Sequence, residues 1–85
     1  MVSRPLTSAE RDILQIAQHH LGPQNTERDV FFTDDGGAAI FAKNLHGSPC
    51  IMLHLTNLAA FIRDGQMTRA DIVRDITDGC GEGAA

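Results

Sequence analysis

The sequence contains no Trp and no Tyr, and its aromatic side chains are limited to four Phe and four His. Binding platforms that stack on bases or sugars are built mainly from Trp, Tyr and Phe, so we expect no such platform here. With 85 residues the chain forms one small domain. A domain of this size buries only about 60 to 65% of its unfolded surface, and self-association would therefore stabilise it.

Positive charge is also scarce, since Lys and Arg number 7 against 11 for Asp and Glu, and the net charge is -4. A protein that gains affinity by neutralising phosphates needs the opposite balance, so nucleic acid is an unfavourable partner. No apolar run approaches the length of a membrane span, and Met1 to Leu6 lacks the apolar core of a secretory signal. We expect a cytoplasmic protein without membrane contact.

Cysteine is limited to Cys50 and Cys80, and neither has a second Cys close enough to form a CxxC pair. Cys50 falls in an apolar run, where a free thiol is usually a small core residue. Cys80 falls in a Gly-rich end, where only an adventitious intermolecular disulfide is expected. The sequence therefore predicts no function for either residue.

The first helix has recognisable ends. Thr7 and Glu10 have the spacing of a capping box, and Gly22-Pro23 is a typical stop. At helical spacing, one face is expected to enter the core, and it contains Ile13, Ile16, Ala17, His20 and Leu21.

Three short strands are expected next, at residues 30–33, 38–43 and 50–55. Asp34 to Gly37 favours a hairpin because Gly tolerates the positive φ values of tight turns. A second turn at residues 44–49 contains Gly and Pro. The three strands therefore form an antiparallel meander.

Both faces of this sheet are predicted to be apolar. Phe31 and Phe32 are adjacent, and successive strand residues point to opposite faces. In the third strand Met52 and His54 alternate with aliphatic residues, whereas a one-sided sheet normally carries polar residues toward solvent. One face is therefore covered by the helices, and the other is covered as well or offered to a partner.

The C-terminal part predicts a helical hairpin. Thr56 or Asn57 is the expected cap of a short helix that ends at Gly65, and Thr68 with Asp71 has the pattern of a second cap. The whole is an α+β domain over residues 1–78, in the order α-β-β-β-α-α, followed by a flexible Gly-rich tail at residues 79–85.

Catalytic and metal-binding patterns are missing from the sequence. The histidines form no HxxxH or HExxH motif and no Cys/His quartet, and the carboxylates of Asp34 and Asp35 are explained by the turn. No nucleophile with a base is recognisable. We expect a protein that is not an enzyme and holds neither metal nor cofactor.

Two resemblances concern nucleic acid. The αβββα order over residues 7–64 resembles the topology of the double-stranded-RNA-binding domain, which implies phosphate contacts from basic residues at the start of its last helix. Thr56 to Ala60 contains no Lys or Arg. Residues 58–76 resemble a helix-turn-helix with Gly65 in the turn, but the second helix is acidic. A nucleic-acid-binding module is therefore kept as an alternative.

That acidity follows a pattern. Asp71, Asp75 and Asp78 have i, i+4, i+7 spacing and form one stripe on the last helix. The stripe is a solvated face or a docking surface, and an acidic ridge can occupy a basic groove that otherwise holds nucleic acid.

The leading interpretation is a small acidic, non-enzymatic protein-interaction domain that docks on a larger protein or self-associates as a homodimer through its outer sheet face. In its size and acidity the protein also resembles a class of proteins, the regulators and inhibitors of phages and other mobile elements, which includes anti-CRISPR proteins. A small-ligand-binding protein with a pocket near His54 and Met52 is a further alternative. The candidate interaction residues are Phe31, Phe41, Met52, His54, Asp71, Asp75 and Asp78.

Overall fold

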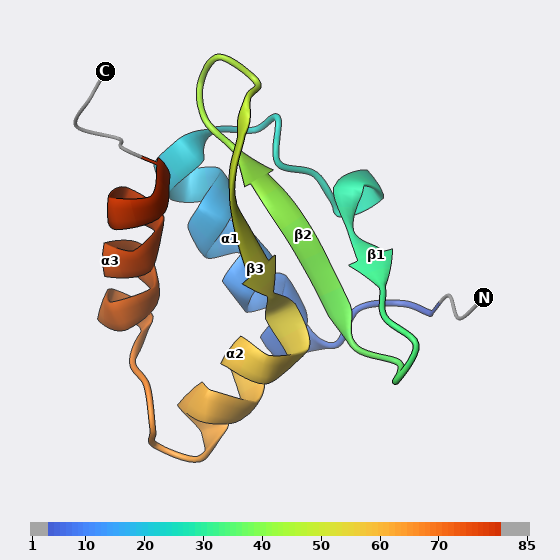
Figure 1. Cartoon of the computed structure of the whole chain (residues 1–85). Helices are drawn as coiled ribbons and strands as arrows, with labels where there is room; N and C mark the ends of the chain where they lie inside the picture. Colours follow the sequence, from blue (N-terminus) through green and yellow to red (C-terminus); the bar gives the residue numbers. More distant parts are fainter. Residues whose placement is uncertain (1–3, 81–85) are drawn as a thin grey trace.

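A computed structural model of the protein describes residues 4–80 (Figure 1). Its elements are α1 (Ser8–Leu21), the 3-10 turn η1 (Glu27–Asp29), β1 (Phe31–Phe32), β2 (Ala38–Lys43), β3 (Pro49–His54), α2 (Leu55–Arg63) and α3 (Arg69–Cys80). The strands form one antiparallel sheet in the order β1-β2-β3. The predicted α+β class, the α-β-β-β-α-α order and the meander are confirmed.

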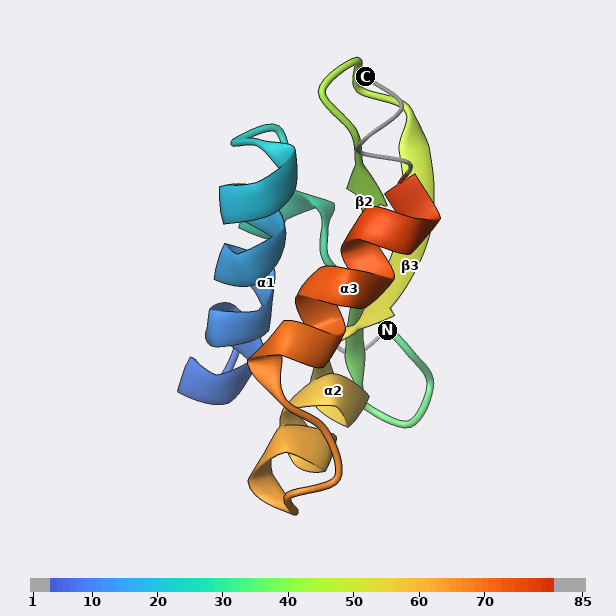
Figure 2. The same cartoon turned by 90° about the vertical axis from the view of Figure 1, so that its left-hand side faces the viewer.

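The two long helices lie on one side of the sheet. Figure 2 shows α1 and α3 packed against the inner side of β2 and β3, with α2 at one end. Ala38, Ile40 and Ala42 of β2 are completely buried on that inner face. The small alanines permit a close approach of α1, while Ile40 fills the space between sheet and helix.

The core face of α1 differs from the predicted one at two residues, Leu14 and His20. Ile13, Ile16, Ala17 and Leu21 are buried as expected, and Leu14 joins them. His20 is exposed, so its placement in the core is wrong. It lies at the rim between α1 and α3, where water can satisfy a polar ring that a core would have to desolvate.

The structure confirms two predicted caps, one at the start of α1 and one at the start of α3. Each combines a threonine with an acidic residue three positions later. The Thr7 hydroxyl accepts a bond from the Glu10 amide at 3.1 Å, and the Thr7 amide donates to the Glu10 carboxylate at 2.9 Å. The Thr68 hydroxyl and the Asp71 carboxylate form the equivalent pair at the start of α3. These local bonds set where each helix begins.

The cap of α2 is not the predicted one. Neither Thr56 nor Asn57 is the cap; His54 is, and its Nδ1 accepts a bond from the Asn57 amide at 3.3 Å. The Thr56 hydroxyl is used elsewhere, accepting from the Ala38 amide at 2.8 Å and donating to Glu10 at 2.6 Å. As a result β3 passes into α2 without a loop, and Leu55 belongs to the helix rather than the strand.

Cys50 and Cys80 form a disulfide that joins β3 to the end of α3. Cys50 packs against the core as expected but is not a free thiol, and Cys80 forms a disulfide within the chain rather than between molecules. The expected domain end at residue 78 falls inside α3, which continues to Cys80, and residues 81–85 of the expected tail lie outside the described residues. Gly79 makes the approach possible, because a Cβ there would lie 2.7 Å from Ile51 Cδ1.

Candidate interaction face

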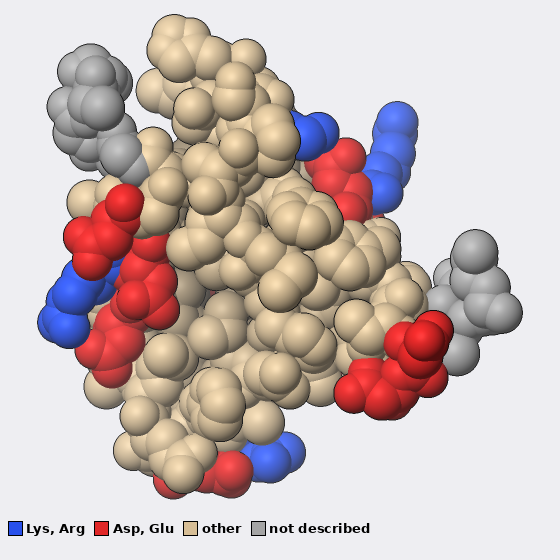
Figure 3. Space-filling view, in the orientation of Figure 1, with Lys and Arg blue, Asp and Glu red and all other residues tan. Residues whose placement is uncertain are grey.

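The sheet side opposite the helices carries a row of exposed apolar side chains. Register pairs Phe31 with Ala39, Ala39 with His54, and Phe41 with Met52, so these five residues share one side, which we call the outer face. Its large apolar residues are well exposed, by 37% for Phe31, 53% for Phe41 and 49% for Met52. Figure 3 looks onto the outer face. Charged side chains lie toward the margins of this view, and its centre is free of charge.

Two aromatic rings give the outer face a fixed shape. Phe31 and Phe41 stack with ring centroids 5.4 Å apart and planes at 20°. Ala39, which pairs with Phe31 and lies two residues before Phe41 on β2, is completely buried. Phe32 packs with the core on the other side, where the Arg4 guanidinium lies 5.4 Å from its ring centroid. The opposite placement of the two neighbouring Phe residues is thus confirmed.

The three aspartates of the predicted stripe have different surroundings. Asp71 caps α3 and pairs with Arg74 at 3.5 Å, and the hydrogen bonds from the Thr68 amide and hydroxyl hold the pKa of its carboxyl below its usual value. Asp75 and Asp78 make no ion pair with any residue between positions 4 and 80. Local structure therefore accounts for Asp71, but not for the other two.

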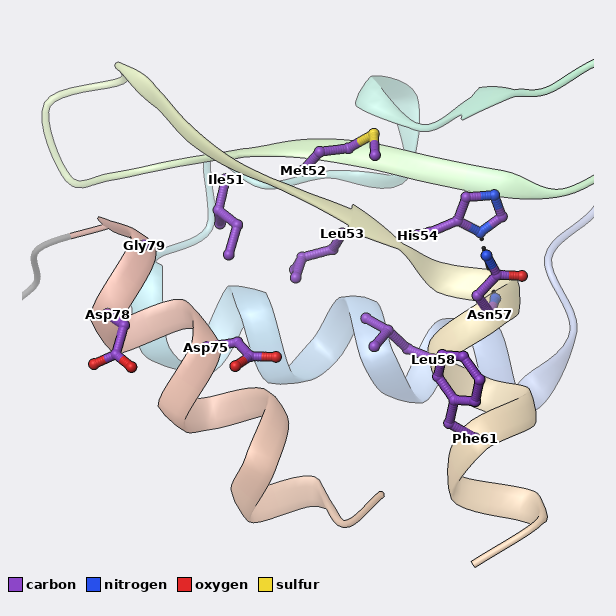
Figure 4. A pocket seen from close by; sticks show the side chains of 10 residues that line it. All are labelled: Ile51, Met52, Leu53, His54, Asn57, Leu58, Phe61, Asp75, Asp78 and Gly79. Atoms are coloured by element: carbon purple, nitrogen blue, oxygen red, sulfur yellow. Dashed lines mark hydrogen bonds between the residues drawn. The ribbon is translucent and has the colours of Figure 1, made fainter. Parts of the chain in front are cut away.

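Asp75 and Asp78 line a groove that the sequence does not predict. It lies between β3, α2 and α3, has a volume of about 500 Å³ and is open to solvent (Figure 4). Leu53, Leu58 and Phe61 contribute apolar wall, and Met52 and His54 belong to both the groove and the outer face. The groove is therefore continuous with the outer face.

The most elaborate polar cluster surrounds Glu10. Its carboxylate accepts two bonds from the Arg4 guanidinium, both at 2.8 Å, and one from the Thr56 hydroxyl. Arg4 also donates to the Gly36 carbonyl at 2.9 Å. These bonds, that of Arg4 first, lower the pKa of Glu10 to about 2. Every oxygen of this carboxylate is used in holding segments together, so the cluster has a structural role.

Asn25 is the second buried polar residue, at 1% exposure. Its side chain accepts from the Lys43 amide at 2.7 Å and donates to the Lys43 carbonyl at 3.0 Å. The amide group thereby replaces a strand partner at the irregular end of β2, where the register shifts between Ala42 and Lys43. Sequence reasoning missed both clusters, since only the capping position of Glu10 has a local signal.

Within residues 4–80, no group of three or more His, Cys, Asp or Glu is placed to hold a metal ion. The expected lack of metal, cofactor and enzymatic activity stays a prediction. In the same part of the chain, every helix is too short or too polar to cross a membrane. Comparisons with protein-family models, with curated proteins and with solved structures each found no match.

Proposed function

We propose that the protein is a small acidic, non-enzymatic interaction domain that docks on a larger protein through its outer face. The observation that carries this proposal is the exposure of Phe31, Phe41 and Met52 in one uncharged row. Aromatic and Met side chains are enriched at the centres of protein interfaces, where a few buried anchors supply most of the affinity.

The charges around the outer face favour a partner with a basic rim. Lys43 and Arg74 are each paired, with Asp29 at 3.6 Å and Asp71 at 3.5 Å. Asp75 and Asp78 are not paired within the described residues and flank the face beyond β3. A basic rim complements these carboxylates, whereas a second copy of this acidic chain adds like charge.

The size of the apolar row also favours a larger protein as the partner. Taking about 200 Å² for each fully exposed large side chain, the three residues offer roughly 280 Å² of surface. At about 25 cal/mol per Å² this burial is worth about 7 kcal/mol gross, against association costs of about 4 to 15 kcal/mol. A stable interface usually buries about 800 Å² on each partner, so the row is its anchor and a larger partner must also contact the rim.

A domain of this kind acts by covering a surface, which is the property of a regulator or inhibitor. The cytoplasmic location expected from the sequence stays a prediction. The Cys50–Cys80 disulfide favours an oxidising compartment instead, because cytoplasmic thiols are generally kept reduced. Trapping the thiols of the protein in intact source cells with an alkylating reagent measures which state is present.

Photo-crosslinking tests the proposal. Phe41 is replaced by a photoreactive benzoyl-phenylalanine, which keeps an aromatic ring in the outer face, and Gln15 on α1 is replaced in the matched control. After irradiation in source-cell lysate, the captured protein is purified and the complex reconstituted. We expect a complex of defined stoichiometry that crosslinks from position 41, not from position 15, and weakens as salt rises.

Three results contradict the proposal. One is the absence of any crosslinked product at position 41. Another is equal crosslinking from positions 41 and 15, which indicates non-specific adhesion. The third is a product that contains only a second copy of the chain, which makes the outer face a homodimer interface.

A further inference from the structure

One edge of β3 has no strand beside it within residues 4–80, because the sheet order is β1-β2-β3. The groove described above borders this edge. Four consecutive residues, Ile51 to His54, line it, and successive strand residues point to opposite faces. A groove that touches all four therefore runs along the side of the strand rather than over one face.

The two ends of this edge differ. At the Cys50 end the disulfide and the close approach of Gly79 to Ile51 hold α3 against the strand. At the other end Leu58 and Phe61 of α2 line the groove (Figure 4). The accessible part of the edge is therefore short and centred on Met52, because Leu53 is only 3% exposed.

The groove is lined mainly by apolar side chains and has carboxylates on one wall. Aliphatic and aromatic side chains come from β3 and α2, and the two carboxylates come from α3. In Figure 4 the Asp75 side chain extends from α3 toward the space in front of Leu53 and Leu58. A group that enters here meets an apolar surface together with carboxylates that have no ion-pair partner between positions 4 and 80.

We propose that the groove binds an extended segment of the partner protein, in which an apolar side chain is flanked by Lys or Arg. The segment lies along the free edge of β3 and forms backbone hydrogen bonds with it, a recurrent mode of peptide recognition. Its apolar side chain enters beside Leu58 and Phe61, and its cations lie near Asp75 and Asp78. This inference rests on the proposed function, in which the partner is a protein.

Selection from a display library of random heptapeptides tests the sequence preference. The intact oxidised protein is the bait, and we expect enrichment of peptides that combine aliphatic residues with Lys or Arg. The D75N/D78N variant should bind a selected peptide roughly threefold to tenfold more weakly at low salt. The D12N/E27Q variant has the same net charge and changes two exposed acidic residues outside the groove, so its binding should match that of the unchanged protein.

Hydrogen exchange tests the position of the peptide. Addition to the edge of β3 predicts slower exchange of β3 amides when the selected peptide is bound, and little change in α1. The inference is overturned by a selection without enrichment, by equal weakening in both charge variants, or by unchanged exchange in β3.

The two proposals fail separately. If the crosslink from position 41 yields a defined complex but no basic and apolar peptide is selected, the outer face docks a protein and the groove inference is wrong. If peptides are selected while position 41 gives no crosslink, the groove binds its segment and the outer face has a different role.

Discussion

At Glu10, distant segments of the chain meet on one buried carboxylate. Arg4 reaches it from the N-terminal side, Thr56 from α2, and Arg4 extends the contact to Gly36 between β1 and β2. The charge is compensated by short hydrogen bonds, which is the condition under which a buried ion is tolerated. The same residue caps its own helix, so local and long-range structure depend on one side chain.

The pH dependence of stability should report on this carboxylate. The pKa of Glu10 is lowered from 4.5 to about 2 in the folded protein. The stabilisation is therefore present above pH 4.5 and is lost as the pH falls toward 2, by about 3 kcal/mol in all. Denaturant titrations across this range should show a loss of stability that the Glu10→Gln variant largely lacks.

The same variant should be less stable than the unchanged protein by about 2 kcal/mol at pH 7, because Arg4 loses its charged partner. The D12N variant is the control, since Asp12 is exposed on α1. Identical acid profiles for Glu10→Gln and the unchanged protein would show that the pKa of Glu10 is not lowered.

At the scale of elements, the disulfide fixes how α3 lies on β3. It closes a loop with a sequence separation of 30 residues. From loop entropy, such a closure stabilises the folded state by about 3 to 4 kcal/mol. We expect the variant with both Cys50→Ser and Cys80→Ser to melt about 15 to 25 °C lower than the oxidised protein. Calorimetry measures the difference, and an unchanged melting temperature would contradict it.

Substitutions at Gly79 and Ile51 should have non-additive effects on the stability of the protein. An alanine at position 79 gains at most about 1 kcal/mol in helix propensity, because the position is next to the end of α3, and it places its Cβ 2.7 Å from Ile51 Cδ1. Overpacking of this kind costs about 1 to 3 kcal/mol, so Gly79→Ala should destabilise the protein. Combining it with Ile51→Val removes Cδ1, and a double-mutant cycle should then give a favourable coupling energy. Strict additivity of the two changes would show that α3 does not approach β3 this closely.

Local signals predicted most of the elements. Capping residues located the starts of α1 and α3, and glycines with polar neighbours located the turns of the meander. What local signals could not predict depends on distant partners. The bonds of Thr56 to Ala38 and Glu10 leave the cap of α2 to His54, and the disulfide depends on α3 reaching β3. Neither arrangement has a spacing rule that can be recognised before the fold is known.

At the scale of the whole molecule, the helices cover one side of the sheet and leave the other open (Figures 1 and 2). Strand alternation predicted that Phe31 and Phe32 lie on opposite sides and that Met52 and His54 share one side, but only the register of the structure shows that Phe31 and Phe41 lie on that same side. Alternation could not predict the groove, which needs the position of α3. The position of α3 places Asp75 and Asp78 near the outer face, while Asp71 caps the start of α3.

We propose that the outer face is the docking surface for a protein partner. The affinity of the purified partner for Phe41→Ser and for Leu45→Ser tests this proposal. Leu45 is more exposed than Phe41, at 73% against 53%, but lies in the turn after β2. Both variants should remain folded by circular dichroism. We expect Phe41→Ser to weaken binding by about 30-fold or more, as loss of an interface anchor does, and Leu45→Ser to change it less than about threefold. Equal affinities for the two variants would contradict the proposal.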